Sequence, residues 1–368
     1  MQGPLASTLR TRADLIKAMA SPLAYPRPGT EAELDAFLGS RGSRYFELQD
    51  AAGKPYGFAG NSGPLRQVPT LLLQGNRDVL FNLTEGWRNF TYFGSTGADV
   101  RLLSTEGGHM NPLAEQKEGT ASCGKLQGVN TIMAWFDHYL KGASSQAFSE
   151  IPKVCISVAD TVGAPDVADA GLFLDRVPVG SQSGTGGVAA LAQSLSASVV
   201  LGSAPLFLPV KTIPDAGLVL AGIPRLASIT VTPGQGAVQA ALAYIGIGIL
   251  RAGELILVDD QVTPFAQGIH ASNRGENNHE VNLPGIGEQL QKGDVIGLLL
   301  YENHPQYLAV VSTASAPNLP FVAGSITGVP LPAVGVGPSL PNPYKVVITG
   351  AELPVLAPGL YPGSKLSQ

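Results

Sequence analysis

The chain has 368 residues, enough for two domains with hydrophobic cores, and a formal net charge of −5. This weak negative charge gives no electrostatic reason to expect a nucleic acid or an anionic membrane as a partner. No run of about 20 apolar residues predicts a transmembrane helix, and the N-terminus lacks the apolar segment of a signal peptide. With 45 glycines, 29 prolines and only 14% charged residues, the composition favours a soluble protein of many short strands joined by turns.

Two helical patterns open the chain, over Ala13–Met19 and Thr30–Leu38. Thr30 is suited to cap the second helix, because Glu33 follows it at the spacing of a capping box. Prolines separate the two patterns. We therefore expect a short helical region before residue 64.

The next segment alternates between strand and helix patterns. A strand of buried type, Thr70–Gln74, runs into the loop Gly75–Asp78. Apolar residues at spacings of three and four predict an amphipathic helix over residues 83–93. A second apolar strand, Val100–Leu103, ends in the turn Glu106–His109. Open α/β sheets place ligands and chemistry just past the C-terminal ends of such strands.

Asp78 and His109 each follow the end of one of these strands, in the chain order that completes a serine-hydrolase triad. His109 is the expected base, and Asp78 is the expected acid that holds its tautomer. Taken singly, His109 is also compatible with a turn residue and Asp78 with a helix N-cap. Glu106 is a rival acid on the turn that carries His109, whereas Asp99 precedes its strand and lies at the wrong end of the sheet.

Three motifs in this order resemble the X-Pro dipeptidyl peptidase and cocaine-esterase-like family of serine hydrolases. They are the acid loop Gly75–Asp78, the turn Gly107–His109 and the helix end Trp135–Gly142, which reads WFDHYLKG. The likeness covers roughly residues 64 to 350. It implies an ester or X-Pro peptide substrate, with Asp78 and His109 as the acid and the base.

The resemblance also implies a domain organisation of mixed α/β and all-β class. Residues 1–63 would be the remnant of helices that cap the active site. Residues 64–150 would form the C-terminal half of an α/β-hydrolase domain, which is therefore incomplete. Residues 151–368 would form a jelly-roll β-sandwich with a proline-rich crossing at residues 329–343 and a final strand.

The pattern beyond residue 142 is consistent with that β-domain, because short apolar runs alternate with glycine or proline. Residues 180–187, GSQSGTGG, have the composition of a flexible loop. The expected strands are Ile151–Val158, Ser198–Leu201, Gly217–Ala221, Ser228–Thr232, Val238–Ile245, Glu254–Val258, His279–Leu283, Val295–Tyr301, Leu308–Ser312 and Tyr344–Ile348.

The nucleophilic serine is missing from the pattern. A nucleophile elbow reads G-x-S-x-G, because small residues must flank a strained strand-to-helix turn, and no such pentad occurs in the chain. Ser62 lies in GNSGP, which we interpret as a surface turn because no apolar strand leads into it. We therefore expect the nucleophile on a missing or separate N-terminal segment, either cleaved from the same precursor or encoded separately, so that this chain alone is inactive.

Cys123 and Cys155 are the only cysteines. One precedes the helix that contains Trp135 and the other lies on the strand after it, so the two are expected to meet and form a disulfide. Two unrelated buried thiols are the alternative. A structural disulfide favours an extracellular or cell-envelope location, with an upstream signal missing from this chain.

No cofactor and no metal site are expected. The histidines outside the candidate site lack metal-ligand spacing, and residues 273–280 lack the regular acidic positions of a calcium loop. Two other functions stay open beside the hydrolase. One is a catalytically inactive relative that acts as a structural or binding subunit of a cell-envelope assembly, and the other is a carbohydrate- or surface-binding module on the sandwich.

Overall fold

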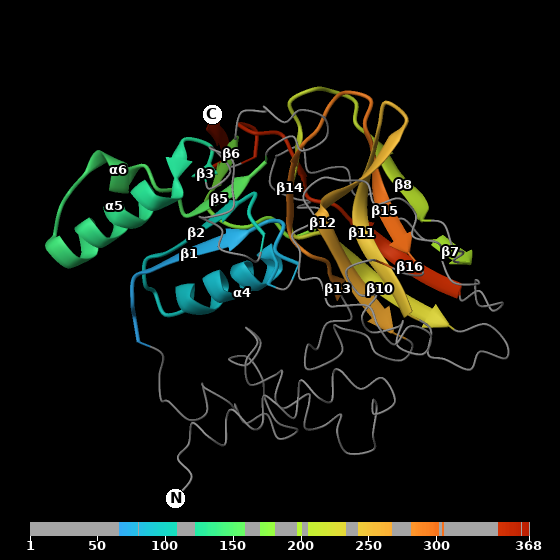
Figure 1. Cartoon of the computed structure of the whole chain (residues 1–368), viewed down its shortest axis with the longest axis horizontal. Helices are drawn as coiled ribbons and strands as arrows, with labels where there is room; N and C mark the ends of the chain where they lie inside the picture. The colour runs from blue at the N-terminus through green and yellow to red at the C-terminus, as the bar shows by residue number, and fades with distance from the viewer. Residues whose placement is uncertain are drawn as a thin grey trace, which may run out of the picture. The chain divides into compact units, whose positions relative to one another are not determined.

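The computed structural model describes residues 66–79, 81–108, 122–158, 170–180, 197–200, 205–232, 242–266, 281–301, 304, 345–361 and 363–367. Apart from His304, these residues all belong to one compact unit, which lies within Leu65–Glu302 and Pro330–Gln368 (Figure 1). The expected cap helices before residue 64 and the expected strand Leu308–Ser312 lie outside the described residues.

A five-stranded sheet carries both predicted strand ends. Its strands lie in the order β1 (Thr70–Gly75), β2 (Val100–Thr105), β5 (Val154–Ser157), β6 (Gly171–Leu174) and β18 (Lys365–Ser367). β1, β2 and β5 are parallel, β6 is antiparallel to β5, and β18 is antiparallel to β6. The sheet therefore takes strands from both sides of residue 150.

Two helices pack on opposite faces of this sheet, as the alternation of side chains along β1 requires. Leu72 packs in the hydrophobic cluster that contains residues of α4 (Leu83–Gly94). Leu71 and Leu73 point the other way, into the cluster of α5 (Gly128–Lys141). The result is a three-layer α/β/α arrangement (Figure 1). The hairpin of β3 (Ser122–Cys123) and β4 (Leu126–Gln127) precedes α5, and the short helix α6 (Gln146–Ser149) follows it.

Most of the remaining strands form a β-sandwich. One antiparallel sheet has the order β13 (Val281–Asn282), β10 (Arg225–Thr232), β16 (Lys345–Glu352) and β7 (Ala197–Val200). The other has the order β12 (Glu254–Ala266), β11 (Leu242–Arg251), β15 (Val295–Tyr301) and β8 (Leu206–Thr212). Alternate apolar residues of both sheets share one buried cluster, which is the core of the sandwich.

A small third sheet joins the two parts of the unit. It consists of β14 (Ile286–Gln289), β9 (Val219–Gly222) and β17 (Val355–Leu356). Val219 and Ala221 of β9 pack in the cluster of the five-stranded sheet, whereas Leu220 packs in the core of the sandwich. One strand therefore contributes to both cores, so the described α/β part and the sandwich share a packed layer.

The sequence predicted several elements within a few residues, including β1, α4, β10 and β15. β8 was not predicted, and Pro209 explains why, because proline lacks the N–H that a central strand needs. β8 is an edge strand, and its register shifts where Pro209 pairs with Gly297. β12 extends to Ala266 instead of ending at Val258, because it contains a bulge that local pattern does not reveal.

Candidate active site

The two strand ends that carry the predicted acid and base lie side by side. β1 and β2 pair in parallel up to Gly75 and Thr105. Beyond the strands, the backbone N–H of Asn76 donates to the Thr105 carbonyl at 2.7 Å, and that of Arg77 donates to the Gly107 carbonyl at 3.1 Å. The loop that bears Asp78 is therefore tied to the turn that leads towards residue 109.

Gly75 makes this tight approach possible. A Cβ atom at position 75 would lie 2.1 Å from the Gly107 carbonyl oxygen, closer than any side chain allows. Any other residue at position 75 would push the two loops apart. Close packing against the Gly107 carbonyl therefore requires glycine at position 75 of the acid loop.

Asp78 is buried and closes the turn after β1. One of its carboxylate oxygens accepts a hydrogen bond from the backbone N–H of Phe81 at 2.9 Å. The alternative that Asp78 is the N-cap of the following helix is wrong, because the cap is Asn82, whose side chain accepts from the Thr84 N–H at 3.1 Å. His109 lies outside the described residues, which end here at Gly108.

Glu106, the rival acid, is also buried at this edge of the sheet. Its carboxylate accepts from the Asn76 side-chain amide at 3.4 Å and lies 3.7 Å from the Arg77 guanidinium. The same amide of Asn76 also donates to the Ser157 carbonyl at 3.0 Å. Glu106 therefore takes part in a buried polar network that extends towards β5.

Asp99 lies at the opposite end of β2, as expected, and has a structural role. Its carboxylate contacts the side chains of Arg101 at 2.9 Å, Lys153 at 2.7 Å and the Tyr139 hydroxyl at 2.7 Å. Burial by itself would raise the pKa of Asp99, but these hydrogen bonds outweigh it and hold the pKa well below its usual range. Burial and the neighbouring Asp99 in turn raise the pKa of Tyr139 to about 12.

The sandwich contributes three polar residues that the sequence did not single out. Gly248 pairs with Leu257 and Gly246 with Val262, so residues 258–261 of β12 form a bulge opposite a single residue of β11. Asp260 in this bulge forms an ion pair with Arg77 at 2.9 Å. The Gln261 amide donates to the backbone carbonyls of Asn76 at 2.7 Å and Asp78 at 3.1 Å.

Asp259, the third polar residue of the bulge, is fully buried. Its Oδ2 accepts from the backbone N–H of Gly287 at 2.8 Å, while Oδ1 has no hydrogen-bond partner among the described residues. Burial and, next, the charge of Glu106 raise the pKa of Asp259 well above its ordinary value, although Arg77 acts in the opposite direction. Asp259 therefore keeps its proton to a higher pH than an exposed aspartate does.

Replacing Asp259 by asparagine is expected to stabilise the protein at neutral and alkaline pH. Because the folded-state pKa is raised, the contribution of Asp259 is complete below its unfolded pKa of about 3.9 and is lost as the pH rises towards the folded value. Asparagine keeps the acceptor for Gly287 and cannot ionise. In urea unfolding from pH 4 to 8, Asp259→Asn should gain roughly 1–3 kcal/mol over the wild type at the upper end.

The neighbouring Asp260 is the matched control for this experiment. Its side chain is 49% exposed, so its ion pair with Arg77 is worth at most about 1 kcal/mol. Asp260→Asn should therefore give no gain in stability at pH 8. An Asp259→Asn protein that is less stable than the wild type at every pH would show that the buried carboxyl is ionised and needed as such.

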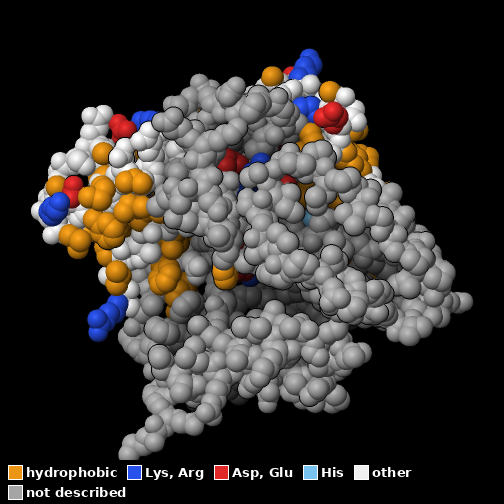
Figure 2. All heavy atoms as spheres, in the orientation of Figure 1, with side chains coloured by type: hydrophobic (Ala, Val, Ile, Leu, Met, Phe, Trp, Pro, Cys, Tyr) orange, Lys and Arg blue, Asp and Glu red, His pale blue; other side chains and the backbone are white. Residues whose placement is uncertain are grey.

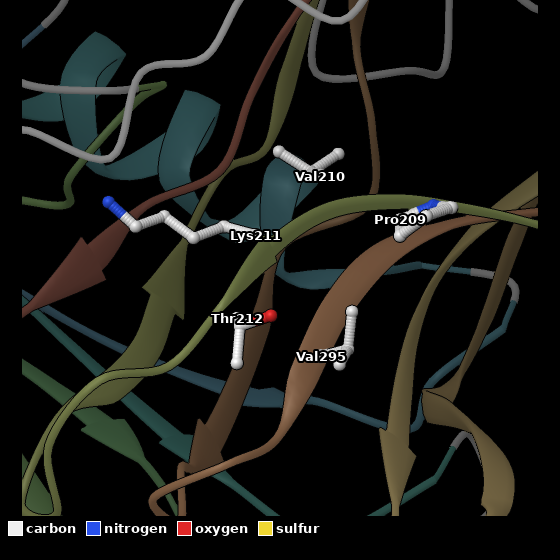
Figure 3. Close-up of a pocket in the computed structure, with 5 residues that line it drawn as sticks. All are labelled: Pro209, Val210, Lys211, Thr212 and Val295. Atoms are coloured by element: carbon white, nitrogen blue, oxygen red, sulfur yellow. The ribbon is translucent and has the colours of Figure 1, made fainter.

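A shallow pocket on the sandwich offers no competing chemistry. It is lined by Pro209, Val210, Lys211 and Thr212 of β8 and by Val295 of β15 (Figure 3). Its lining contains neither an acid nor an imidazole, so it holds no acid–base pair. Within the described residues, no group of three or more His, Cys, Asp or Glu side chains is arranged to hold a metal ion. In the same part of the chain, no helix is long and apolar enough to span a membrane.

Cys123 and Cys155 form a disulfide, as expected from their positions before and after α5. Both are buried, and they lie in the cluster that contains Trp135 and Phe173. The bond joins the β3–β4 hairpin to β5 in the middle of the five-stranded sheet. It lies on the face of the sheet that α5 covers.

Comparisons with known proteins give matches in structure only. No family model matches the chain, and no curated protein matches it in sequence. Among solved structures, a CocE/NonD family hydrolase from Staphylococcus aureus matches with a TM-score of 0.46 and 11% identity, over 85% of this chain and 57% of that one. This hydrolase belongs to the family that the sequence motifs resemble.

Two further solved structures match at a similar level. An aminopeptidase from a marine sediment Thaumarchaeota archaeon has a TM-score of 0.42 and 15% identity, over 80% of this chain and 56% of its own. An alpha-amino acid ester hydrolase has a TM-score of 0.40 and 12% identity, over 79% and 56%. The chain thus spans a little more than half the length of each of these proteins.

Proposed function

We propose that this chain supplies the acid and the base of a serine hydrolase that acts on an acyl ester or on a peptide with a penultimate proline. Asp78 is the acid and His109 the base. The observation that supports this most is the tie between the two loops, in which the Arg77 N–H donates to the Gly107 carbonyl at 3.1 Å. Gly108, the last described residue of this turn, is also close to the acid loop, because a Cβ atom at this position would lie 3.7 Å from the Arg77 carbonyl oxygen.

The proposed reaction proceeds through an acyl-enzyme. The serine oxygen attacks the carbonyl carbon of the substrate while its proton passes to His109. The tetrahedral adduct then collapses, and the leaving alcohol or amine takes the proton from His109. A water molecule then attacks the acyl-enzyme while its proton passes to His109. Collapse of this second adduct releases the carboxylic acid and returns the proton to the serine oxygen. Asp78 holds the imidazole tautomer and stabilises the imidazolium.

The nucleophile is proposed to lie on a segment outside residues 1–368, either missing from this sequence or on a separate polypeptide, because these residues contain no G-x-S-x-G pentad. The outer edge of β1 supports this proposal. β1 pairs with β2 alone among the described strands, and the side chains of residues 70–74 are only half-buried, although three of them are leucines. A parallel strand with an open edge is a template for pairing with a further strand.

The outer face of α5 also supports a partner. Val129, Met133, Phe136 and Leu140 form one apolar stripe along this helix, with exposed fractions of 58%, 53%, 50% and 77%. Hydrophobic side chains gather over the position of α5 at the left of the molecule (Figure 2). A continuous apolar stripe on a helix indicates a surface that packs against another element. We propose that the partner supplies the N-terminal half of the hydrolase domain, including its serine.

A fluorophosphonate probe tests this proposal on the native protein, isolated with its partners by a tag on this chain. The probe reacts with an activated serine, so the label is expected on the co-isolated polypeptide and not on this chain. Phe136→Lys should abolish co-isolation of the labelled polypeptide. Asn130→Lys, which adds the same charge on the polar side of α5, should leave it intact. Label on residues 1–368 would contradict a separate nucleophile.

The absence of the pentad favours one alternative, a catalytically inactive relative that acts as a structural or binding subunit of a cell-envelope assembly. That function predicts no labelled polypeptide at all. In either case we propose an extracellular or cell-envelope location, because structural disulfides persist mainly in oxidising compartments. We also propose that the sandwich is of the jelly-roll type.

A further inference from the structure

Gln261 reaches from the sandwich to both ends of the turn that carries the candidate acid. Its side chain is buried, and its Nε2 donates to the Asn76 carbonyl at 2.7 Å and to the Asp78 carbonyl at 3.1 Å. These two carbonyls flank Arg77. One amide group therefore fixes the backbone on both sides of a single residue, and one of its two acceptors belongs to the candidate acid itself.

The bulge that presents Gln261 is held in a costly conformation. Asp259 and Asp260 both have left-handed backbones, with φ of 52° and 56°. Such a conformation is unfavourable for non-glycine residues, and it persists only where the surroundings impose it. Here the surroundings do so on both sides, through the Gly287 N–H on Asp259 and the Arg77 guanidinium on Asp260.

Close packing fixes the support on which the bulge rests. A Cβ atom at Gly287 would lie 1.9 Å from the Ser157 carbonyl oxygen, so β14 is in direct backbone contact with the end of β5. β5 in turn pairs with β2, which leads into the turn before residue 109. The five-stranded sheet therefore supports both the bulge and the two loops of the candidate site.

We propose that Gln261 is a positioning residue of the hydrolase, which sets the direction of the Asp78 carboxylate towards His109 by clamping the carbonyls of Asn76 and Asp78. This inference rests on the proposed function, because it assumes that Asp78 and His109 act as a pair. The Asp78 side chain has only two torsions beyond its backbone, so a shift of the backbone displaces the carboxylate directly. A side chain of the sandwich thus sets the position of the acid, which follows a strand of the five-stranded sheet.

The histidine tautomer provides a readout that loss of stability alone would not change. A carboxylate that accepts from Nδ1 keeps the imidazole proton on that nitrogen. Nitrogen NMR of the full-length protein with 15N-labelled histidine measures this directly at about pH 9, where unperturbed imidazoles are neutral. His138 is an internal reference, because its Nδ1 lies 3.0 Å from the Ala143 carbonyl, which can only accept. His109→Gln assigns the resonance of His109.

Four variants then separate the possible outcomes. Asp78→Asn and Gln261→Met should each lower the ratio of the Nδ1–H to the Nε2–H tautomer of His109 by about fivefold or more, the value of one ordinary hydrogen bond. Gln261→Asn, whose amide is too short to reach both carbonyls, should do the same and replaces Gln261→Met if that variant does not fold. Thr84→Val is the matched control, because it removes a buried hydrogen bond, from the Thr84 hydroxyl to the Leu283 carbonyl, that involves neither Gln261 nor Asp78.

The result expected is a changed tautomer ratio in the Asp78 and Gln261 variants and an unchanged ratio in Thr84→Val. If Asp78→Asn changes the ratio and both Gln261 variants leave it unchanged, Gln261 is not a positioning residue, and the proposed function stands. If Thr84→Val changes the ratio as well, the effect is a general loosening, and the proposal is overturned. If Asp78→Asn leaves the ratio unchanged, the Asp78–His109 pair itself is wrong.

Discussion

Asp78→Asn is expected to lower the hydrolytic rate of the assembled enzyme by about 10⁴ while leaving the fold intact. The asparagine amide can still accept from the Phe81 N–H, so the turn after β1 is retained. It cannot stabilise an imidazolium, and its N–H₂ group favours the wrong tautomer of His109. The measurement is kcat/KM on a chromogenic ester, with circular dichroism to verify the fold.

Glu106→Gln is the control that distinguishes the two candidate acids. Glu106 lies at the same edge of the sheet but is engaged with Asn76 and Arg77. We expect this variant to lose stability and to keep kcat/KM within about tenfold of the wild type, because Glu106 is not the acid of the proposed pair and affects the site only through the positions of its neighbours. A 10⁴-fold loss in Glu106→Gln, together with near-normal activity in Asp78→Asn, would transfer the role of the acid to Glu106.

Loss of the disulfide is expected to have the largest effect on stability. The bond closes a loop between residues 32 positions apart, and the entropy of such a loop in the unfolded chain corresponds to about 3–4 kcal/mol. The Cys123→Ala/Cys155→Ala double variant should therefore lose about that amount of unfolding free energy in urea. Within the structure, the local loss of stability should be greatest where the β3–β4 hairpin meets β5.

Treatment of the wild type with a reductant is the companion measurement. It should reproduce the destabilisation of the double variant and have no effect on the variant itself. Peptide mapping without reduction should recover Cys123 and Cys155 in one linked species. Two free thiols in protein from oxidising conditions would remove the argument for an extracellular or cell-envelope location.

Local pattern was sufficient for the strands and helices that have one buried face. Apolar residues at helical spacing located α4, and the glycine at position 142 correctly marked the end of α5, where its φ is 67°. Short or interrupted strands were missed, because a run such as Gly171–Leu174 is too short for its period to be read. The N-cap of α4 was placed four residues too early as one alternative for Asp78, since both Asp78 and Asn82 are good caps.

The sequence by itself determined that an acid and a glycine turn follow two successive strands, because strand ends and turn residues are encoded locally. Only the tertiary structure decided that Gln261 and Asp260 hold the acid loop, across separations of 183 to 185 residues. It also decided that Asp259 is buried where the charge of Glu106 raises its pKa. These contacts depend on a bulge in β12 and on a third sheet packed between two cores, and neither has a periodic signature in the chain. Long-range packing, which no local pattern specifies, therefore decides which polar groups meet at the site.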